Sequence, residues 1–348
     1  MREPSLIWNR YEPNNPGGSH QRLNERIGRS DIMPADIPKM RRILHRRSFI
    51  SQSNIFKTCA CLLVCLFVSA AAQKSYEKEI QTWRMQQEAQ LKSDDGWLTV
   101  VGLFWLKEGA NGFGTDPSSD ITLPEASAPA RAGVFEFHKG KVTLRVAEGV
   151  TIKSQGRDVI EMEMKPDTSG KPDVISINDV AMHIIERGAR YGVRVKDKNS
   201  RQRREFTGLK WFPVQESYHI AAKFVAYDKP RDVPIPNVLG DIVNMPSPGY
   251  VIFNLAGREH RLEPVMSGSD QLFFIFSDST TGKATYPAGR FLYTDLPKEG
   301  IVRLDFNKAV NPPCAFTDFA TCPLPPPQNR LKVAIEAGEK AYHAKETK

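Results

Sequence analysis

The chain has 348 residues, of which 40% are hydrophobic and 25% are charged, and its formal net charge is +8. This composition is ordinary for globular proteins, and the length leaves room for two domains. Residues 1–72 hold 11 Lys/Arg against 5 Asp/Glu, whereas residues 73–348 hold 37 against 35. The positive excess therefore belongs to the N-terminal segment, and we expect no nucleic-acid partner for the rest of the chain.

The first 72 residues have the organisation of an export signal. Residues 1–39 lack apolar periodicity, and we expect them to be disordered or to be an over-extended start ahead of Met40. In residues 40–72, paired arginines precede a short apolar run, Cys59–Val68, and then small residues, Ser69–Ala72, as in a signal peptide. The run is shorter than the roughly 20 residues of a membrane span. We expect an exported protein, periplasmic or extracellular, which contacts a membrane only through this segment if it stays uncleaved.

The next part of the chain is predicted to be one helix followed by a small β-sandwich. Within residues 73–96, Tyr76, Ile80, Trp83 and Leu91 fall near one face of a helix. Residues 97–165 then contain short strands separated by turns, including a hairpin whose two-residue turn is Lys139-Gly140.

The strand rhythm of residues 97–165 resembles the opening of forkhead-associated (FHA) domains, which are β-sandwiches that bind phosphothreonine. Thr115 stands where that family has an arginine, and residues 126–132 hold no counterpart of its histidine. The resemblance therefore implies an FHA-like sandwich without a phosphopeptide partner.

The second half of the chain is predicted to be a separate β domain. Residues 166–172, PDTSGKP, are expected to be the linker, and residues 341–348 a short tail. Many short strands and few helices in residues 173–340 indicate an antiparallel β-barrel-like domain. Within it, Lys229–Asn237 holds three prolines and is expected to be a loop. The predicted fold class is thus mainly β, with one N-terminal helix.

The C-terminal part of the chain carries a dense set of uncommon residues at fixed spacing. These are Asp278, Thr280, Gly282, Tyr286, Gly289-Arg290-Phe291, Asp305-Phe306-Asn307, Asn311-Pro312-Pro313-Cys314, Cys322-Pro323 and Ala337-Gly338-Glu339. The set is similar to the signature of a bacterial family known only as domain of unknown function number 1684, and the likeness covers roughly residues 97–340. The resemblance implies a family and no activity.

Charged side chains on otherwise apolar strands are the candidates for a functional site. Asp278, Arg290 and Asp305 belong to segments that resemble buried strands, and each should have a partner because an unpaired buried charge is costly. One interpretation is a structural ion pair between Arg290 and Asp305. The other is a polar pocket in which Arg290 holds an anionic or hydroxylated ligand. The further binding candidates are Tyr286, Asn307, Arg187, Arg194 and Glu339.

Two functions of different classes fit these residues. The first is a non-catalytic binding or envelope-associated module whose ligand is a small molecule or an envelope polymer. The alternative is a hydrolase of carbohydrate or another cell-envelope polymer, in which burial raises the pKa of Asp278 or Asp305 for acid–base catalysis. No G-x-S-x-G, H-E-x-x-H or Walker motif is present, and the histidines after residue 97 are scattered singly. We therefore expect neither a metal nor a cofactor.

Two cysteines, Cys314 and Cys322, remain after the predicted cleavage of the signal peptide. An exported protein lies in an oxidising compartment, and no histidine is near them in the sequence. The pair is therefore predicted to form a disulfide.

Overall fold

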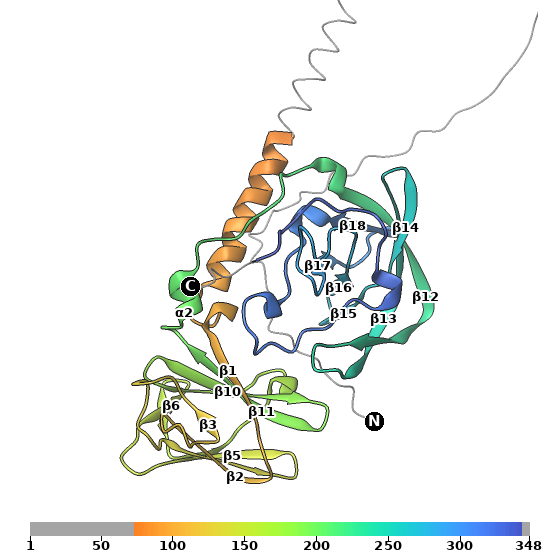
Figure 1. Cartoon of the computed structure of the whole chain (residues 1–348). Helices are drawn as coiled ribbons and strands as arrows, with labels where there is room; N and C mark the ends of the chain where they lie inside the picture. The colour runs from red at the N-terminus through yellow and green to blue at the C-terminus, as the bar shows by residue number, and fades with distance from the viewer. Residues whose placement is uncertain (1–72, 343–348) are drawn as a thin grey trace, which may run out of the picture. The chain divides into compact units, whose positions relative to one another are not determined.

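The computed structural model of the chain describes residues 73–342 (Figure 1). The predicted start segment and signal peptide, residues 1–72, lie outside the described residues, as does most of the predicted tail. Residues 73–91 form a helix that buries Ile80, Arg84, Gln87 and Leu91, so the predicted helix is confirmed and ends at 91. In the described part of the chain, no helix has the length and apolar character needed to cross a membrane.

The helix is followed by a sandwich of two sheets. Its elements are η1 Trp97–Thr99, β1 Val100–Trp105, β2 Gly109–Gly114, β3 Ile121–Thr122, β4 Gly133–His138, β5 Lys141–Val146, β6 Ile152–Ser154, β7 Arg157–Val159, β8 Glu161–Glu163, η2 Asp167–Ser169, β9 Val174–Ile177, β10 Val180–Arg187 and β11 Arg190–Asp197. The strand orders are β1-β11-β10-β9-β6-β7 and β3-β2-β4-β5-β8. Side chains from both sheets, among them Phe113, Phe135 and Ile184, share one core. The predicted hairpin is present, and its turn residues Lys139 and Gly140 have φ of 48° and 81°.

The boundary between the two halves lies later than residues 166–172. Strand β11 is hydrogen-bonded to β1 on one side and to β10 on the other, so 174–197 complete the first sandwich. Residues 166–172 are a connection inside it, because backbone pairing joins segments that are distant in sequence. The first sandwich therefore ends at Asp197, and the short helix α2 (Arg201–Glu205) follows.

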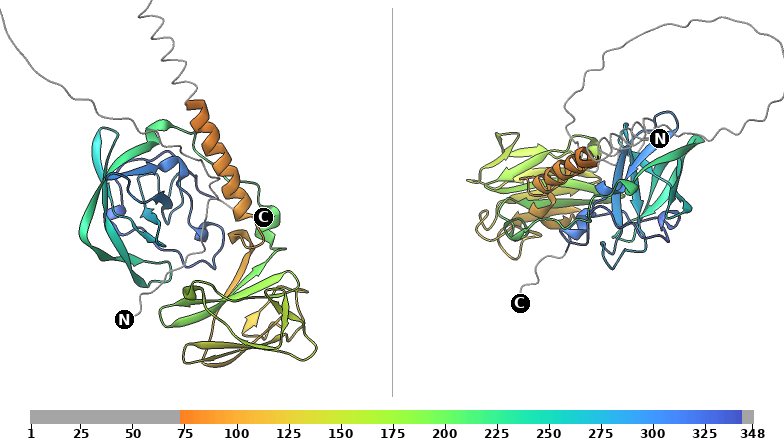
Figure 2. Two further views of the ribbon diagram at one scale, coloured as in Figure 1. Left: turned by 180° about the vertical axis from the view of Figure 1, so that it is seen from behind. Right: turned by 90° about the horizontal axis from the view of Figure 1, so that it is seen from above.

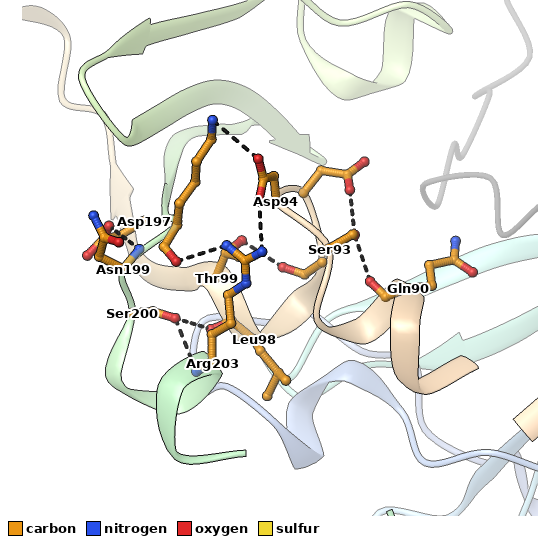
Figure 3. A network of polar contacts seen from close by, with 12 residues as sticks. Gln90, Ser93, Asp94, Leu98, Thr99, Asp197, Asn199, Ser200 and Arg203 are labelled. Atoms are coloured by element: carbon orange, nitrogen blue, oxygen red, sulfur yellow. Dashed lines mark hydrogen bonds and ion pairs between the residues drawn. The ribbon is translucent and has the colours of Figure 1, made fainter. Parts of the chain in front are cut away.

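Polar contacts hold α2 and the residues before it against residues 94–98, which follow the first helix (Figure 3). Arg203 Nη2 donates to Asp94 Oδ1 at 2.8 Å, and Lys198 Nζ lies 3.3 Å from the other Asp94 oxygen. The buried Ser200 hydroxyl donates to the Leu98 carbonyl at 2.5 Å. These contacts fix the path of the chain as it leaves the sandwich.

The second half contains two further sheets. Its elements are η3 Glu216–Tyr218, β12 His219–Pro236, β13 Ile242–Leu255, β14 Arg258–Leu262, β15 Val265–Ser267, β16 Gln271–Phe276, β17 Arg290–Asp295, β18 Ile301–Asp305, η4 Phe306–Lys308, η5 Pro313–Ala315 and η6 Pro327–Asn329. The sheets have the orders β14-β13-β12-β18 and β15-β16-β17. Among the described strands, the two sheets do not join into a closed barrel. The predicted β-barrel-like domain is therefore a pair of sheets. The outer edge of β17 pairs with Val310 instead of with β18, through two hydrogen bonds of 2.9 Å between Phe291 and Val310.

The proline-rich segment predicted to be a loop is a strand. Pro230, Pro234 and Pro236 all lie in β12, which pairs with β13 as far as Pro236. Strand β18 pairs with β12 only over His219–Lys223, and at the end of β12 the Leu324 amide donates to the Pro236 carbonyl at 2.7 Å. Prolines an even number of residues apart place their missing N–H groups on one side of a strand, and an edge without a full partner strand tolerates that.

The C-terminal segment is part of the core of the second half. Ile335 and Ala337 are fully buried and share a cluster with Phe253, Phe276 and Leu304. Seen from behind, the blue C-terminal segments lie inside the curve of β12, β13 and β14 (Figure 2). Because of this placement, signature residues from other segments of the chain lie next to residues 335–340.

Candidate functional site

Asp278 and Arg290 form a sealed ion pair. Arg290 Nη2 lies 2.6 Å from Asp278 Oδ2, and both side chains are fully buried. Arg290 also donates to the Ile335 carbonyl at 2.9 Å and to the Ala337 carbonyl. The other Asp278 oxygen accepts from the amide and hydroxyl of Thr280 at 2.7 and 2.6 Å. Both carboxylate oxygens are therefore occupied, and the pair anchors the C-terminal segment.

The expected pairing of Arg290 with Asp305 is wrong, and the strand register explains why. Arg290 is opposite Phe276 on β16, and Asp278 follows Phe276 by two residues on the same side of the chain. Asp305 is opposite His219 on β12, which belongs to the other sheet. The structure therefore does not bring Arg290 and Asp305 together in one pocket.

Glu339 is a buried acid on the other side of the same segment. It is 1% exposed, and its two oxygens accept from the amide and the side-chain nitrogen of Asn311 at 2.9 and 2.7 Å. Burial raises the pKa of Glu339 to about 8. The preceding Gly338 has φ of +79°, and a Cβ there would lie 2.5 Å from the Ala309 oxygen, so only glycine fits. Glu339 is thus held by neighbours and is largely neutral at pH 7.

Asp305 and Asn307 form a second group together with the N-terminal helix. Tyr76 donates from its hydroxyl to Asp305 Oδ1 at 2.8 Å, and Asn307 donates from Nδ2 to that hydroxyl at 3.0 Å. The Asn307 amide also donates to Asp305 Oδ1 at 3.1 Å. Burial and the hydrogen bond to Asp305 raise the pKa of Tyr76. Asp305 and Asn307 thus contact each other, but apart from Arg290 and Tyr286, with which they were predicted to form one pocket. Their partner on the helix, Tyr76, was not predicted.

Beside this group, Arg84 is buried without an acceptor for two of its nitrogens. It is 6% exposed, and its guanidinium carbon lies 4.8 Å from the centroid of the Trp211 ring. In the part of the chain that the structure describes, neither Nε nor Nη2 of Arg84 has a hydrogen-bond partner, and neither has Trp211 Nε1. In Arg194 and Arg290, by comparison, Nε is the one nitrogen without a hydrogen-bond partner among the described residues. Arg84 and Trp211 thus form a group of three buried, unpartnered N–H donors.

The charge of Arg84 is only distantly compensated. Burial lowers the pKa of Arg84, whereas the charges of Asp305, Tyr76 and Glu77 oppose that shift. Among the described residues, no carboxylate lies within ion-pair distance of Arg84. Arg84 is four residues from Ile80 and seven from Leu91, so it lies on the buried face of the helix. A charged residue on that apolar face is the sequence feature that could have identified Arg84 as a candidate.

Cys314 and Cys322 lie side by side but are not bonded. Both are free thiols, and the Cys314 amide donates to Cys322 Sγ at 3.1 Å. Tyr286 donates from its hydroxyl to the Cys314 carbonyl at 2.7 Å. The predicted disulfide is therefore not present in this structure. Tyr286 belongs to this thiol group and not to a group with Arg290.

Arg187 and Arg194 lie on the first sandwich and reach the loop between the two cysteines. Arg194 is almost fully buried over the Trp97 ring, and it donates to the Phe319 carbonyl at 3.4 Å. Burial lowers its pKa to about 10. Arg187 pairs with Asp167 at 2.8 Å and donates to the Thr321 hydroxyl at 3.0 Å. The candidates therefore divide into separate groups, and no group of three His, Cys, Asp or Glu side chains that could hold a metal is found among the described residues.

Comparison with known proteins identifies the second half of the chain. The model of the family described as protein of unknown function (DUF1684) matches residues 204–340. A solution NMR structure of an uncharacterized protein of Haloarcula marismortui is 31% identical, over 42% of this chain and 81% of that one, with a TM-score of 0.34. The chain belongs to the DUF1684 family. The family match begins after the first sandwich, so the likeness covers less of the chain than the predicted 97–340.

The chain has a weak structural likeness to FHA domains. The FhaA FHA domain, solved with the intracellular domain of another protein, is 15% identical over 27% of this chain and 97% of that one, with a TM-score of 0.20. An FHA domain from a study of phosphothreonine-dependent interactions is 17% identical over 28% and 96%, again with a TM-score of 0.20. No curated protein matches this DUF1684 chain. The described residues are mainly β, and the name DUF1684 assigns no activity to them.

Proposed function

We propose that this DUF1684 protein is an exported binding module whose ligand presents a carboxylate to Arg84 and Trp211. The observation that carries the proposal is the set of three buried N–H donors without an acceptor. A buried donor with no partner costs about 1–3 kcal/mol, and more when it is charged, so an acceptor at this place is strongly favoured.

The two free nitrogens of Arg84 define the chemistry of the ligand. Nε–H and Nη2–H lie in the guanidinium plane and point in parallel from one of its edges, and a carboxylate can accept from both at once. The indole N–H of Trp211, whose ring lies 4.8 Å from the guanidinium carbon, supplies a third donor. A ligand carboxylate would also neutralise a buried charge that has no ion-pair partner among the described residues.

Neighbouring groups support a ligand that carries hydroxyls as well as a carboxylate. Tyr76, Asp305 and Asn307 form a connected hydrogen-bond network beside Arg84. Glu339, in the segment that pairs with Trp211, is largely neutral at pH 7 and so adds little repulsion toward an anion. Uronic-acid sugars and similar acidic units of envelope polymers combine these two features.

The hydrolase alternative has weaker support. Both oxygens of Asp278 are occupied in a pair that is fully buried. Asp305 accepts from Tyr76 and Asn307, and the second Asp305 oxygen lies 3.7 Å from the Lys308 ammonium. A general base needs a free oxygen within reach of substrate. Asp278 offers none, and the second Asp305 oxygen, which accepts no hydrogen bond among the described residues, lies beside the Lys308 ammonium. We therefore favour binding over catalysis.

Export remains part of the proposal and rests on the residues of the leader. The pattern of residues 40–72 supports delivery to the periplasm or the outside of the cell. Fractionation of cells that express the full chain should find it outside the cytoplasm, and a chain without residues 40–72 should stay inside.

NMR on the Trp211 indole tests the binding site directly. The chain has five tryptophans, so the indole N–H signal of Trp211 can be assigned with Trp211→Phe in isotope-labelled protein. Sodium acetate and sodium glucuronate are the probes, with sodium chloride at equal ionic strength as the control. We expect the carboxylates to cause a saturable shift of this signal. Arg84→Lys keeps the positive charge but loses the two parallel N–H donors of the guanidinium, so it should weaken binding about tenfold or more.

Arg303→Lys is the matched control, because Arg303 is an exposed arginine on β18 in the same half of the chain. This variant should bind as the wild type does. The proposal is refuted if neither carboxylate gives a saturable shift, or if Arg84→Lys and Arg303→Lys bind equally. A Trp211 signal that is insensitive to carboxylates would assign the three donors to ordered water.

A further inference from the structure

The two cysteines form a cluster that the proposed binding site does not use. We propose that Cys314 and Cys322 are a redox-active dithiol that exchanges with external disulfides, in which Cys314 attacks first and Cys322 resolves the mixed disulfide. This activity is independent of Arg84 and Trp211.

The geometry gives the two thiols different roles. Cys322 is fully buried, whereas Cys314, in the short helix η5, is partly exposed. Of the two residues, Cys314 is therefore the one that an external disulfide can reach first. The Cys314 amide donates to Cys322 Sγ at 3.1 Å, so the second thiol is already in contact with the first residue. A partly exposed thiol beside a buried one is the arrangement of an attacking and a resolving cysteine.

The surroundings favour a thiolate at Cys314. The Cys322 thiol and the neighbouring Tyr286 hydroxyl lower the pKa of Cys314, although burial opposes the shift. Burial raises the pKa of Cys322, so the proton of the pair stays on the inner sulfur. The thiolate is the nucleophile in disulfide exchange, and this division assigns the first attack to Cys314.

Arg194 supports the second attack. Its guanidinium is almost fully buried, and its positive charge opposes the rise in the pKa of Cys322. After Cys314 has reacted, Cys322 must lose its proton to act as a nucleophile. A fixed cation near its sulfur stabilises the thiolate that forms.

The reaction balances with a disulfide R–S–S–R as oxidant. The Cys314 thiolate attacks one sulfur, a Cys314–S–S–R bond forms, and R–S⁻ leaves and takes a proton from solvent. Cys322 loses its proton to solvent and attacks the Cys314 sulfur, which releases the second R–S⁻. The protein dithiol loses two electrons and two protons in total, and the external disulfide becomes two thiols.

Single serine variants separate the two roles. The other three cysteines, Cys59, Cys61 and Cys65, are first replaced with serine so that only the pair reacts. Treatment with oxidised glutathione, followed by mass spectrometry, should leave Cys322→Ser carrying one glutathione on Cys314. Cys314→Ser should react about tenfold or more slowly, because its remaining thiol is buried and protonated. The intact pair should lose two hydrogens and hold no glutathione, and a reducing thiol should reverse the change.

Tyr286→Phe tests the assignment without removing a sulfur. The variant lacks the hydroxyl beside Cys314, so the pH at which iodoacetamide labels Cys314 at half its maximal rate should rise relative to the wild type. Thermal unfolding and the amide spectrum of each variant show whether the fold is kept. Equal reaction rates of the two serine variants, an intact pair that stays a dithiol in excess oxidised glutathione, or an unchanged labelling profile in Tyr286→Phe would each overturn the proposal.

Discussion

Replacing Asp278 with asparagine tests whether the Asp278–Arg290 pair is structural. Asparagine keeps the size of the side chain, but its single oxygen can accept from Arg290 or from Thr280 and not from both. The Arg290 charge, 1% exposed, would keep only two backbone carbonyls as acceptors in the contacts described. Removing one partner of a buried pair costs about 3–5 kcal/mol, which is a large part of the roughly 5–15 kcal/mol that stabilises a domain.

Urea denaturation followed by tryptophan fluorescence measures this loss. With a denaturant slope of about 3 kcal/mol/M, the midpoint of unfolding for Asp278→Asn should fall by about 1–1.7 M. Asp295→Asn is the matched control, because the Asp295 side chain is 81% exposed and lies 4.0 Å from Lys298. Its midpoint should not change measurably. A loss below about 1 kcal/mol for Asp278→Asn, or losses that are equal in both variants, would refute the structural role.

Two further predictions concern the C-terminal segment. Because burial raises the pKa of Glu339 from 4.5 to about 8, the folded state holds this proton more tightly, and the unfolding free energy should fall as the pH rises between these values. Glu339→Gln should show a flatter profile in urea titrations over that window, and two parallel profiles would contradict the reasoning. Gly338→Ala should lower the unfolding free energy by more than Gly257→Ala, which has a similar φ but no atom within 4 Å of the new Cβ. We expect about 1–2 kcal/mol for Gly257→Ala and a further loss from the clash at Gly338, and equal losses by calorimetry would exclude the clash.

Local patterns predicted several elements correctly. The Lys139-Gly140 hairpin follows from two adjacent residues that accept positive φ between two alternating strands. In β18 the alternation of Val302 and Leu304 with Arg303 matches the buried and exposed sides. Such features depend on neighbours a few residues apart, and the sequence displays those neighbours directly.

Pairing between distant segments was not predictable in the same way. The turn-rich residues 166–172 look like a domain linker, but β11 returns to pair with β1 and makes them an internal connection. The prolines of β12 exclude a central strand, yet they lie beyond the part of β12 that pairs with β18, at the edge of the sheet. Each of these outcomes depends on which strand lies next to which, and strand register is set by packing across the whole sheet.

The amino-acid sequence was enough to predict the mainly β class, the first helix, the family signature and the need of Asp278, Arg290 and Asp305 for partners. The partners became known only from the folded chain: Asp278 for Arg290, Tyr76 for Asp305, and Trp211 for the buried Arg84. Burial makes a partner obligatory for a charge, and the sequence reveals that need. The partner's identity depends on tertiary contacts, which join Asp278 and Arg290 across a turn and residues 76 and 84 to segments more than a hundred residues away.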